Sequence, residues 1–384
     1  MPRRIVGLGA LAWVLACAPP ALAQIKIGVT ISATGPQASL GIPEKNTVAM
    51  LPREIAGKKV EYIVLDDASD TTQAVTNTRK LIAEDRVDAI IGSTTTPNTL
   101  AMIEFVADEK TPVISLASSS RIVEPMDARR AWMFKAAHSD SMIGSAVVSH
   151  MVDRGAKTVA FIGFNNAMGE SFYQEIAKFA ELRNLKMVAN ERFAPGDSSV
   201  TAQVLKIMAA KADAVVIGAS GTPAAMPARS LAERGYKGIV YFNHGVSNSE
   251  FLKVCGKDCE GAYVATGPVI VARQLSADHP AKRLATDFAN RYETAHGKDS
   301  VAIFAAYAWD AGIWLSKAIP EALKKGQPGT VEFRSALRDA LEGMHDVATA
   351  TGITNMSRSD HAGHDQRSRV MVQVRQGAWH YVGQ

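Results

Sequence analysis

Short apolar segments alternate with longer amphipathic segments along most of this chain, and this alternation constrains the fold more than any other feature. The short segments are rich in Ile, Val and Ala, and most are followed by a stretch in which apolar residues recur with a helical period. Short apolar strands separated by helices are typical of parallel sheets that are buried on both faces. The pattern therefore predicts βαβ units.

The alternation runs through the chain twice, which predicts two lobes. With 384 residues, the chain exceeds the size at which a single hydrophobic core usually stops growing. The predicted fold class is α/β, with two doubly wound parallel-sheet lobes. The expected strands are 25–31, 60–65, 88–92, 112–116, 158–163, 186–190, 214–218, 238–242, 369–375 and 378–382. The expected helices are 45–55, 72–84, 98–109, 142–153, 170–183, 200–211, 224–234, 279–295, 304–319 and 332–342.

Composition excludes several other classes of protein. A hydrophobic content of 47% is too high for a disordered chain. The 42 Lys and Arg residues against 38 Asp and Glu residues give a net charge of only +4, and the basic residues are scattered along the sequence. This balance argues against nucleic acid as a partner.

The first residues have the pattern of a secretory signal peptide. A basic segment at 1–4 precedes an apolar segment at 5–18, and residues 21–23 (Ala-Leu-Ala) match the small-residue pattern that signal peptidase prefers. The apolar segment is shorter than the roughly 18 to 20 residues that cross a bilayer. We therefore expect cleavage after Ala23 and a soluble exported protein that begins at Gln24.

The cysteines divide between this leader and the mature chain. Residues 14–17 loosely resemble a lipoprotein box ending at Cys17, so lipid anchorage is an alternative to cleavage after residue 23, and the less favoured one. In an oxidising compartment, Cys255 and Cys259 are expected to form a small disulfide loop. A redox dithiol would need C-x-x-C spacing, and a metal site would need two more ligands nearby.

Hydroxyl-rich turns follow three of the predicted strands. Open parallel sheets bind ligands beyond the carboxyl ends of their strands, where helix N-termini converge. Thr96 is a candidate N-cap with Pro97 as the first helical residue, and 117–120 (Ala-Ser-Ser-Ser) and 221–223 (Gly-Thr-Pro) are similar turns. A carboxylate at such a turn would meet hydroxyl groups, free N–H groups and a favourable helix dipole. Ordinary helix capping is the alternative for each turn taken alone.

Several segments occur together in an order and spacing that identify a family. The chain resembles the type I periplasmic binding proteins, in particular the leucine/isoleucine/valine-binding group that serves ABC transporters. The segments that carry this resemblance are 27–29 (Ile-Gly-Val), 34–36 (Thr-Gly-Pro), 65–70 (Leu-Asp-Asp-Ala-Ser-Asp), 91–96 (Ile-Gly-Ser-Thr-Thr-Thr), 112–115 (Pro-Val-Ile-Ser), 167–170 (Ala-Met-Gly-Glu), 243–245 (Asn-His-Gly) and 306–310 (Ala-Tyr-Ala-Trp-Asp).

The resemblance implies two lobes joined by a three-crossing hinge, with the ligand in the cleft between them. It also implies closure of the lobes on the ligand and delivery to a membrane permease. The expected division of the chain is signal peptide 1–23, first lobe 24–138, second lobe 139–265, first-lobe return 266–347, and second-lobe and hinge return 348–384.

The resemblance also implies which residues contact the ligand. The hydroxyl that grips the ligand carboxylate falls on Thr96 or Thr95, and the contacts after the next strand fall on Ala117 and Ser119. An aromatic residue that covers the ligand in amino-acid binders is replaced here by Met168, and a further aromatic contact falls on Tyr307. The acidic residue that takes the ligand ammonium group is replaced by His244.

The replacement at His244 bears on the class of ligand. A buried ammonium group without a carboxylate partner is unfavourable by several kcal/mol. An imidazole cannot replace that anion, but it suits a carboxylate, a carbonyl or a phenol. The ligand is therefore expected to be a branched-chain amino acid or, in view of His244, an aromatic or other carboxylate without an amino group. Alternatively, His244 caps a turn and the ammonium finds another partner.

The sequence gives little support for an enzymatic function. The mature sequence contains neither a Gly-x-Ser-x-Gly elbow nor a phosphate-binding or dinucleotide-binding glycine motif. We expect a binding protein of an ABC importer without a cofactor or a metal, acting as a monomer on a small carboxylate ligand and docking on a permease of the inner membrane. A periplasmic sensor of the same fold, feeding a signalling partner, is the alternative.

Overall fold

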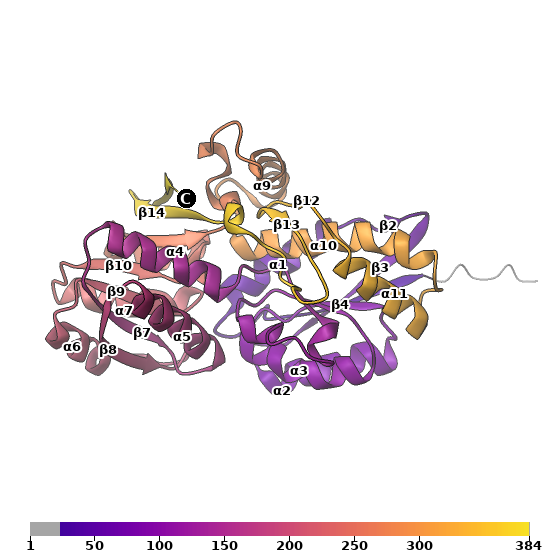
Figure 1. Cartoon of the computed structure of the whole chain (residues 1–384), viewed down its shortest axis with the longest axis horizontal. Helices are drawn as coiled ribbons and strands as arrows, with labels where there is room; N and C mark the ends of the chain where they lie inside the picture. Colours follow the sequence, from indigo (N-terminus) through magenta and orange to yellow (C-terminus); the bar gives the residue numbers. More distant parts are fainter. Residues whose placement is uncertain (1–23, 384) are drawn as a thin grey trace, which may run out of the picture.

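The computed structural model describes residues 24–383, so the predicted leader and Cys17 lie outside the described residues. Two lobes lie side by side, each built on its own sheet with helices packed against it (Figure 1). None of the helices in this part of the chain combines the length and the apolar content that a membrane crossing requires.

The first lobe contains a six-stranded sheet with the order β2-β3-β1-β4-β5-β6. All neighbouring strands are parallel except β2, which is antiparallel to β3. Every apolar residue of the central strand β1 is buried, as expected for a sheet that is covered on both faces. The strands are β1 (Ile25–Ile31), β2 (Glu54–Ile55), β3 (Lys58–Asp66), β4 (Ala89–Gly92), β5 (Val113–Ser115) and β6 (Met133–Lys135). The helices are α1 (Ala38–Met50), α2 (Thr71–Arg79), η1 (Lys80–Glu84), α3 (Thr96–Asp108), η2 (Ser120–Ile122), η3 (Arg130–Trp132), α9 (Lys282–His296), α10 (Ile303–Leu323) and α11 (Val331–Glu342).

The second lobe contains a seven-stranded sheet with the order β15-β14-β11-β10-β9-β7-β8. Strands β7 to β11 are parallel, and the hairpin β14–β15 adds two antiparallel strands at one edge. The strands are β7 (Thr158–Phe164), β8 (Lys186–Phe193), β9 (Ala214–Gly218), β10 (Ile239–Phe242), β11 (Tyr263–Thr266), β14 (Val370–Arg375) and β15 (Ala378–Gly383). The helices are α4 (Asp140–Asp153), α5 (Ala167–Leu182), α6 (Thr201–Ala210), η4 (Thr222–Ala224), α7 (Ala225–Glu233), η5 (His244–Val246), α8 (Ser249–Cys255) and η6 (Gly256–Cys259).

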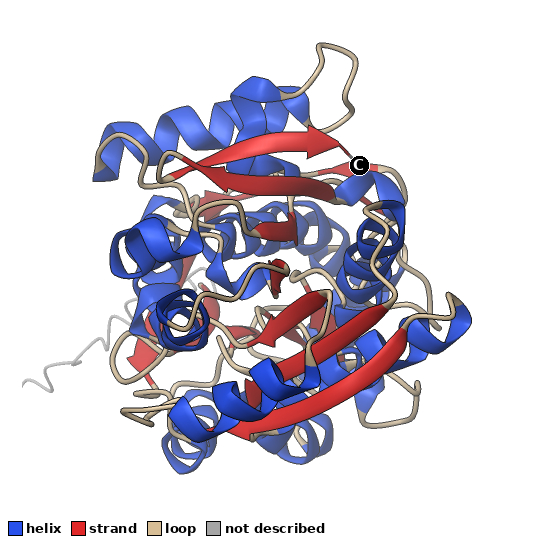
Figure 2. Ribbon diagram, turned by 90° about the vertical axis from the view of Figure 1, so that its left-hand side faces the viewer, coloured by secondary structure: helices blue, strands red, loops and turns tan. Residues whose placement is uncertain are grey.

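The chain passes between the lobes three times. It leaves the first lobe after β6, returns after β11 through η7 (Pro268–Gln274), and leaves again after the small hairpin β12 (Val347–Ala348) and β13 (Ile353–Thr354). The yellow C-terminal segment, which contributes β14, therefore lies on the lobe formed by residues 140–266 (Figure 1). Figure 2, turned by 90°, shows the helices on both sides of the strands.

The predicted fold class is confirmed, and the differences from the sequence-based elements are local. The helix expected at 45–55 is instead α1 at 38–50, which contains Pro43 after its first turn, and residues 54–55 form an edge strand. Strands β6 and β11 and helix α8 were not predicted. These elements have three, four and seven residues, which is too short for a period to be recognised.

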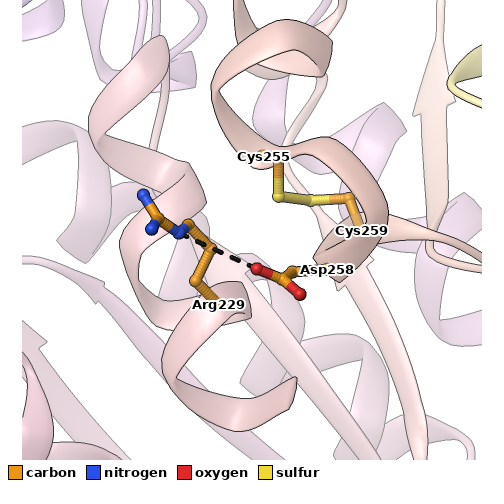
Figure 3. Close-up of a disulfide and its surroundings, with 4 residues drawn as sticks. All are labelled: Arg229, Cys255, Asp258 and Cys259. Atoms are coloured by element: carbon orange, nitrogen blue, oxygen red, sulfur yellow. Dashed lines mark ion pairs between the residues drawn. A yellow bond between two sulfur atoms is a disulfide. The ribbon is translucent and has the colours of Figure 1, made fainter. Parts of the chain in front are cut away.

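A disulfide joins Cys255, the last residue of α8, to Cys259 at the end of η6 (Figure 3). Both cysteines are buried in the apolar core of the second lobe. Beside the bridge, Arg229 of α7 and Asp258 form an exposed ion pair with 3.8 Å between nitrogen and oxygen. The disulfide thus ties the end of α8 to the end of η6.

Reduction of this bridge, or the double substitution of Cys255 and Cys259 by Ser, should lower the free energy of unfolding by about 2 kcal/mol, the entropy of closing a five-residue loop. Denaturant unfolding with and without reductant measures the change. The matched control is Arg229→Ala, which removes an exposed ion pair and should change the stability by less than about 1 kcal/mol. Rapid labelling of both thiols in the native, unreduced protein would contradict the expected bridge.

Candidate ligand-binding cleft

A cavity of about 380 Å³ lies between the lobes, at the carboxyl ends of the parallel strands of both sheets. Its walls come from the loops after β1, β3, β4 and β5 in the first lobe and after β7, β8, β9 and β10 in the second. A larger hollow of about 540 Å³ lies away from this cleft, between η7, α9 and β15, and the charged residues in its wall include Arg273 and Glu293, which pair with each other at 2.6 Å. The strand-end cavity is where this type of sheet binds ligands.

The cavity wall is mainly apolar, with several polar but uncharged side chains. Among the described residues that line it, none is Asp, Glu, Lys or Arg. Its polar side chains are hydroxyls, carboxamides and one imidazole, and its apolar surface comes mainly from Leu40, Phe164, Met168 and Phe304. Such a wall offers hydrogen bonds to a ligand without offering a counter-ion.

The N-terminus of α3 faces this cavity, because residues 95–98 all line it. The N-cap residue is Thr95 rather than the predicted Thr96, and its side chain makes no capping hydrogen bond. By contrast, the N-cap of α5, Asn166, accepts hydrogen bonds from the backbone N–H groups of Met168 and Gly169. The first-turn N–H groups of α3 are thus left available to an anion, together with the positive end of the helix dipole.

Several side-chain atoms around the cavity are buried without a hydrogen-bond partner in the described part of the chain. They are Thr96 Oγ1, Asn98 Nδ2, Asn243 Nδ2, His244 Nδ1 and His244 Nε2. Buried polar groups are normally paired, and an orphaned group calls for an explanation. Thr96, Asn98, Asn243 and one nitrogen of a neutral His244 can each donate a hydrogen bond to a bound acceptor, whereas the second nitrogen of His244 needs a donor.

His244 opens η5, directly after β10, and is fully buried. Burial, reinforced by the neighbouring His138 and Lys135, holds the pKa of His244 well below its usual value. The ring is therefore neutral near pH 7, with one nitrogen that donates and one that accepts. Its neighbours include the rings of Tyr307, at 6.1 Å between centroids, and His138, at 6.3 Å.

Two of the residues expected to contact a ligand do not reach the cavity. The hydroxyl of Ser119 instead crosses to the other lobe, where it donates to Ser171 Oγ of α5 at 2.8 Å. Tyr307 is fully buried in α10, and its hydroxyl lies 2.8 Å from Nδ1 of His138. The neighbouring Ser118 and, one helical turn before Tyr307, Phe304 line the cavity in their place.

The other expected residues, Thr95, Thr96, Ala117, Met168 and His244, all line the cavity. Sequence reasoning missed Asn98, Asn166 and Asn243. The strand-end rule could have found Asn166 and Asn243, since they follow the ends of β7 and β10 by two residues and one residue. Asn98 gave no comparable signal, because it lies inside the first turn of α3.

The lobes touch each other at the rim of the cavity. Gln37, at the N-terminus of α1, accepts a hydrogen bond at Oε1 from Ser220 Oγ at 2.6 Å, and its Nε2 donates to the backbone oxygen of Ser220 at 3.4 Å. Beside it, Ser39 Oγ accepts from the backbone N–H of Thr222 at 3.3 Å. With the Ser119–Ser171 bond, these contacts hold the described lobes in a closed arrangement.

Residues 24–383 contain no cluster of three His, Cys, Asp or Glu side chains placed to hold a metal ion. The buried acid Asp310 is occupied structurally: its carboxylate accepts hydrogen bonds from the backbone N–H groups of Ala350 and Thr351 and from the Thr351 hydroxyl. Burial raises the pKa of Asp310 to about 6.

Comparison with known proteins agrees with this architecture. A family model described as periplasmic binding protein matches residues 24–378. The leucine-, isoleucine-, valine-, threonine- and alanine-binding protein of Pseudomonas aeruginosa is 26% identical over 321 residues, which are 82% of each chain. An extracellular ligand-binding receptor from Rhodopseudomonas palustris HaA2 is 44% identical, with a TM-score of 0.91 over 94% of this chain and 100% of the receptor.

One further solved structure shares the fold at lower identity. It is a solute-binding protein of an ABC transporter from Rhodopseudomonas palustris BisB5, in complex with 3,4-dihydroxybenzoic acid; it is 20% identical, with a TM-score of 0.78 over 94% of this chain and 96% of that one. Proteins of this family bind substrates and are not enzymes. Because the family model matches residues 24–378 of the 384 in this chain, the chain belongs to the periplasmic binding proteins, in the leucine/isoleucine/valine-binding group.

Proposed function

We propose that this protein is the substrate-binding component of an ABC importer and that it carries a small carboxylate without an amino group. The observation that carries the proposal is the chemistry of the cleft. Donors converge on it from both lobes, the uncapped N-terminus of α3 faces it, and its described wall contains no charged side chain. Helix N-termini and neutral donors suit an anion.

The same wall disfavours an α-amino acid. An ammonium group enclosed here would lose its water without meeting a carboxylate, which costs several kcal/mol. His244 is neutral near pH 7, so it can donate to a carboxylate or accept from a hydroxyl, but it supplies no negative charge. A ligand with a carboxylate and an apolar or phenolic body satisfies both the donors and the apolar surface.

The size and lining of the cavity favour an aromatic acid in particular. Phe164, Phe304 and Met168 give flat and adaptable apolar surfaces in a space of about 380 Å³. The relative from Rhodopseudomonas palustris BisB5 has the same fold and binds 3,4-dihydroxybenzoic acid. This example supports the aromatic class without identifying the compound.

The proposal also covers export of the protein and delivery of its ligand to the permease. The leader at residues 1–23 would direct export and be removed, and the mature monomer would bind its ligand in the periplasm. The lobes, with the boundaries given above, would close on the ligand, and both would dock on a permease of the inner membrane. A sensor would use the same cleft but pass the closed state to a signalling partner.

A matched pair of ligands tests the proposed class. 3-Phenylpropanoate and L-phenylalanine share a carboxylate and a phenyl ring, and differ only in the ammonium group. We expect 3-phenylpropanoate and 3,4-dihydroxybenzoate to raise the melting temperature in a thermal-shift assay, because a ligand at 100 times its Kd adds about 2.7 kcal/mol to the free energy of unfolding. An equal or larger shift with L-phenylalanine or L-leucine would contradict the exclusion of amino acids.

Substitution of His244 should reverse this preference. His244→Glu places a carboxylate where an ammonium group could pair with it, so the affinity for L-phenylalanine should rise relative to that for 3-phenylpropanoate. The matched control is His244→Gln, which keeps a neutral donor and acceptor and should keep the order of the wild type. Calorimetric titration of all three proteins with both compounds measures the ratio, and an unchanged ratio in His244→Glu would remove this argument.

The rim contacts should contribute to affinity through the closed state. Gln37→Ala removes two hydrogen bonds to Ser220, each worth about 0.5–1.5 kcal/mol, so we expect binding of 3-phenylpropanoate to weaken by about 5- to 150-fold, mainly through faster dissociation. Gln174→Ala is the matched control, because Gln174 bonds only to Glu170 on the same exposed helix face. Equal dissociation rates in stopped-flow measurements would show that the rim does not hold the lobes closed.

A further inference from the structure

A buried acid lies directly behind the ligand-facing loop after β4. Glu44 of α1 has no exposed surface. One of its carboxyl oxygens, Oε2, is hydrogen-bonded to Thr94 Oγ1, and the other, Oε1, has no partner in the described part of the chain. Thr94 itself lines the cavity, next to Thr95 and Thr96.

No positive charge compensates Glu44 within the described elements that pack against it. On α1 itself, the neighbouring Lys45 is exposed. On α10, which packs along α1, Lys317 is exposed, and Asp310 is engaged with the backbone of residues 350–351. The charged group that acts on Glu44 is another acid, Asp67.

Asp67 is placed as an acceptor. Its two oxygens accept hydrogen bonds from Ser32 Oγ at 2.6 Å and Ser93 Oγ at 2.7 Å. An ionised Glu44 would thus be a second buried anion near the first, without a cation. Burial raises the pKa of Glu44 well above its usual value, with Asp67 adding to the rise and the bond to Thr94 opposing it.

The protonation state of Glu44 decides what the Thr94 hydroxyl can do. A hydroxyl has one hydrogen to donate and can accept two hydrogen bonds. Thr94 Oγ1 already accepts from the backbone N–H of Ser32 at 2.9 Å. If Glu44 is ionised, it takes the hydroxyl hydrogen of Thr94. If Glu44 is neutral, it can donate its own proton to Thr94 Oγ1, and the Thr94 hydrogen remains free for a ligand.

We propose that Glu44 is a positioning residue, which as a neutral acid donates to Thr94 Oγ1 and so directs the Thr94 hydroxyl hydrogen toward the carboxylate of the ligand. The role of Thr94 rests on the proposed function, because it requires an anion in the cleft. The neutral state of Glu44 does not, and it can be tested without a ligand.

The ligand-free test uses stability as a function of pH. A carboxyl group whose pKa is raised on folding lowers the free energy of unfolding as the pH increases from the unfolded pKa, about 4.5, through the folded pKa. We therefore expect the wild type to lose stability relative to Glu44→Gln as the pH rises over this interval. Parallel curves of unfolding free energy against pH for the two proteins would show that Glu44 is not neutral in the folded protein.

A second measurement needs only the wild type. Asp140 and Asp310 are buried acids whose pKa burial raises to about 6, so both are mostly ionised at pH 7. If Glu44 is neutral as proposed, an infrared carbonyl band of a protonated carboxylic acid is expected at pH 7, stronger than the small neutral fractions of Asp140 and Asp310 account for. Absence of this band would overturn the proposal even if Glu44→Gln fails to fold.

The ligand test uses 3-phenylpropanoate and five proteins over a range of pH. We expect the affinity of the wild type to fall by about 10- to 100-fold as Glu44 ionises, since one hydrogen bond to a charged group is lost. Glu44→Gln should lack this fall, while titration of Lys135, whose pKa burial lowers to about 8, and of His244 affects both proteins alike. If the affinity of the wild type and of Glu44→Gln depends on pH in the same way, Glu44 does not control the Thr94 hydroxyl.

Thr94→Val and the double variant Thr94→Val with Glu44→Gln complete the cycle. Without the hydroxyl, the state of Glu44 should no longer matter, so these two proteins should show parallel pH profiles and bind about tenfold or more weakly than Glu44→Gln. Thr94→Ser should restore the wild-type profile. If no carboxylate binds to the wild type, both the proposed function and the proposed role of Thr94 fail. The two ligand-free measurements still decide the protonation state of Glu44.

Discussion

The constraint on which the rest of this structure depends is the balance of charge in a cleft that closes. A ligand enclosed between the lobes loses its water, so its charge must be met by groups that the protein already holds in place. Here those groups are dipoles rather than ions: the open end of α3, the Thr96 hydroxyl and the amide of Asn243. Dipoles of this orientation favour an anion, and the described wall has no carboxylate to pair with an ammonium group.

Closure and the lining of the cleft involve neighbouring residues, and some residues take part in both. Ser119, which a family comparison places on the ligand, instead bonds to Ser171 of the opposite lobe, while its neighbour Ser118 lines the cavity. Gln37 lines the cavity and also bonds to Ser220 across the rim. A ligand that fills the cleft is thereby linked to contacts that exist only when the lobes are closed.

The fold could be predicted from the sequence because its strands are short, apolar and regularly spaced. β1 and β9 were found to the residue, whereas β6 and β11 were missed because they are too short to show a period. The site was predictable as far as strand ends specify it, which covers Thr96 and His244. Ser119 and Tyr307 do not line the cavity, whereas Ser118, one residue away, and Phe304, one helical turn away, do, because a sequence specifies the loop but not the direction of each side chain within it.

On the first crossing of the hinge, the buried imidazole of His138 is neutral, like that of His244 in the cleft. His138 on the first crossing bonds to Tyr307 and lies near the backbone oxygen of Thr351, and burial lowers its pKa to about 3. The second crossing passes so close that a side chain at Gly267 would meet His138 Cε1 at 2.8 Å. In the proposed function, the ligand anion brings a charge into a cleft whose described wall has no Asp, Glu, Lys or Arg.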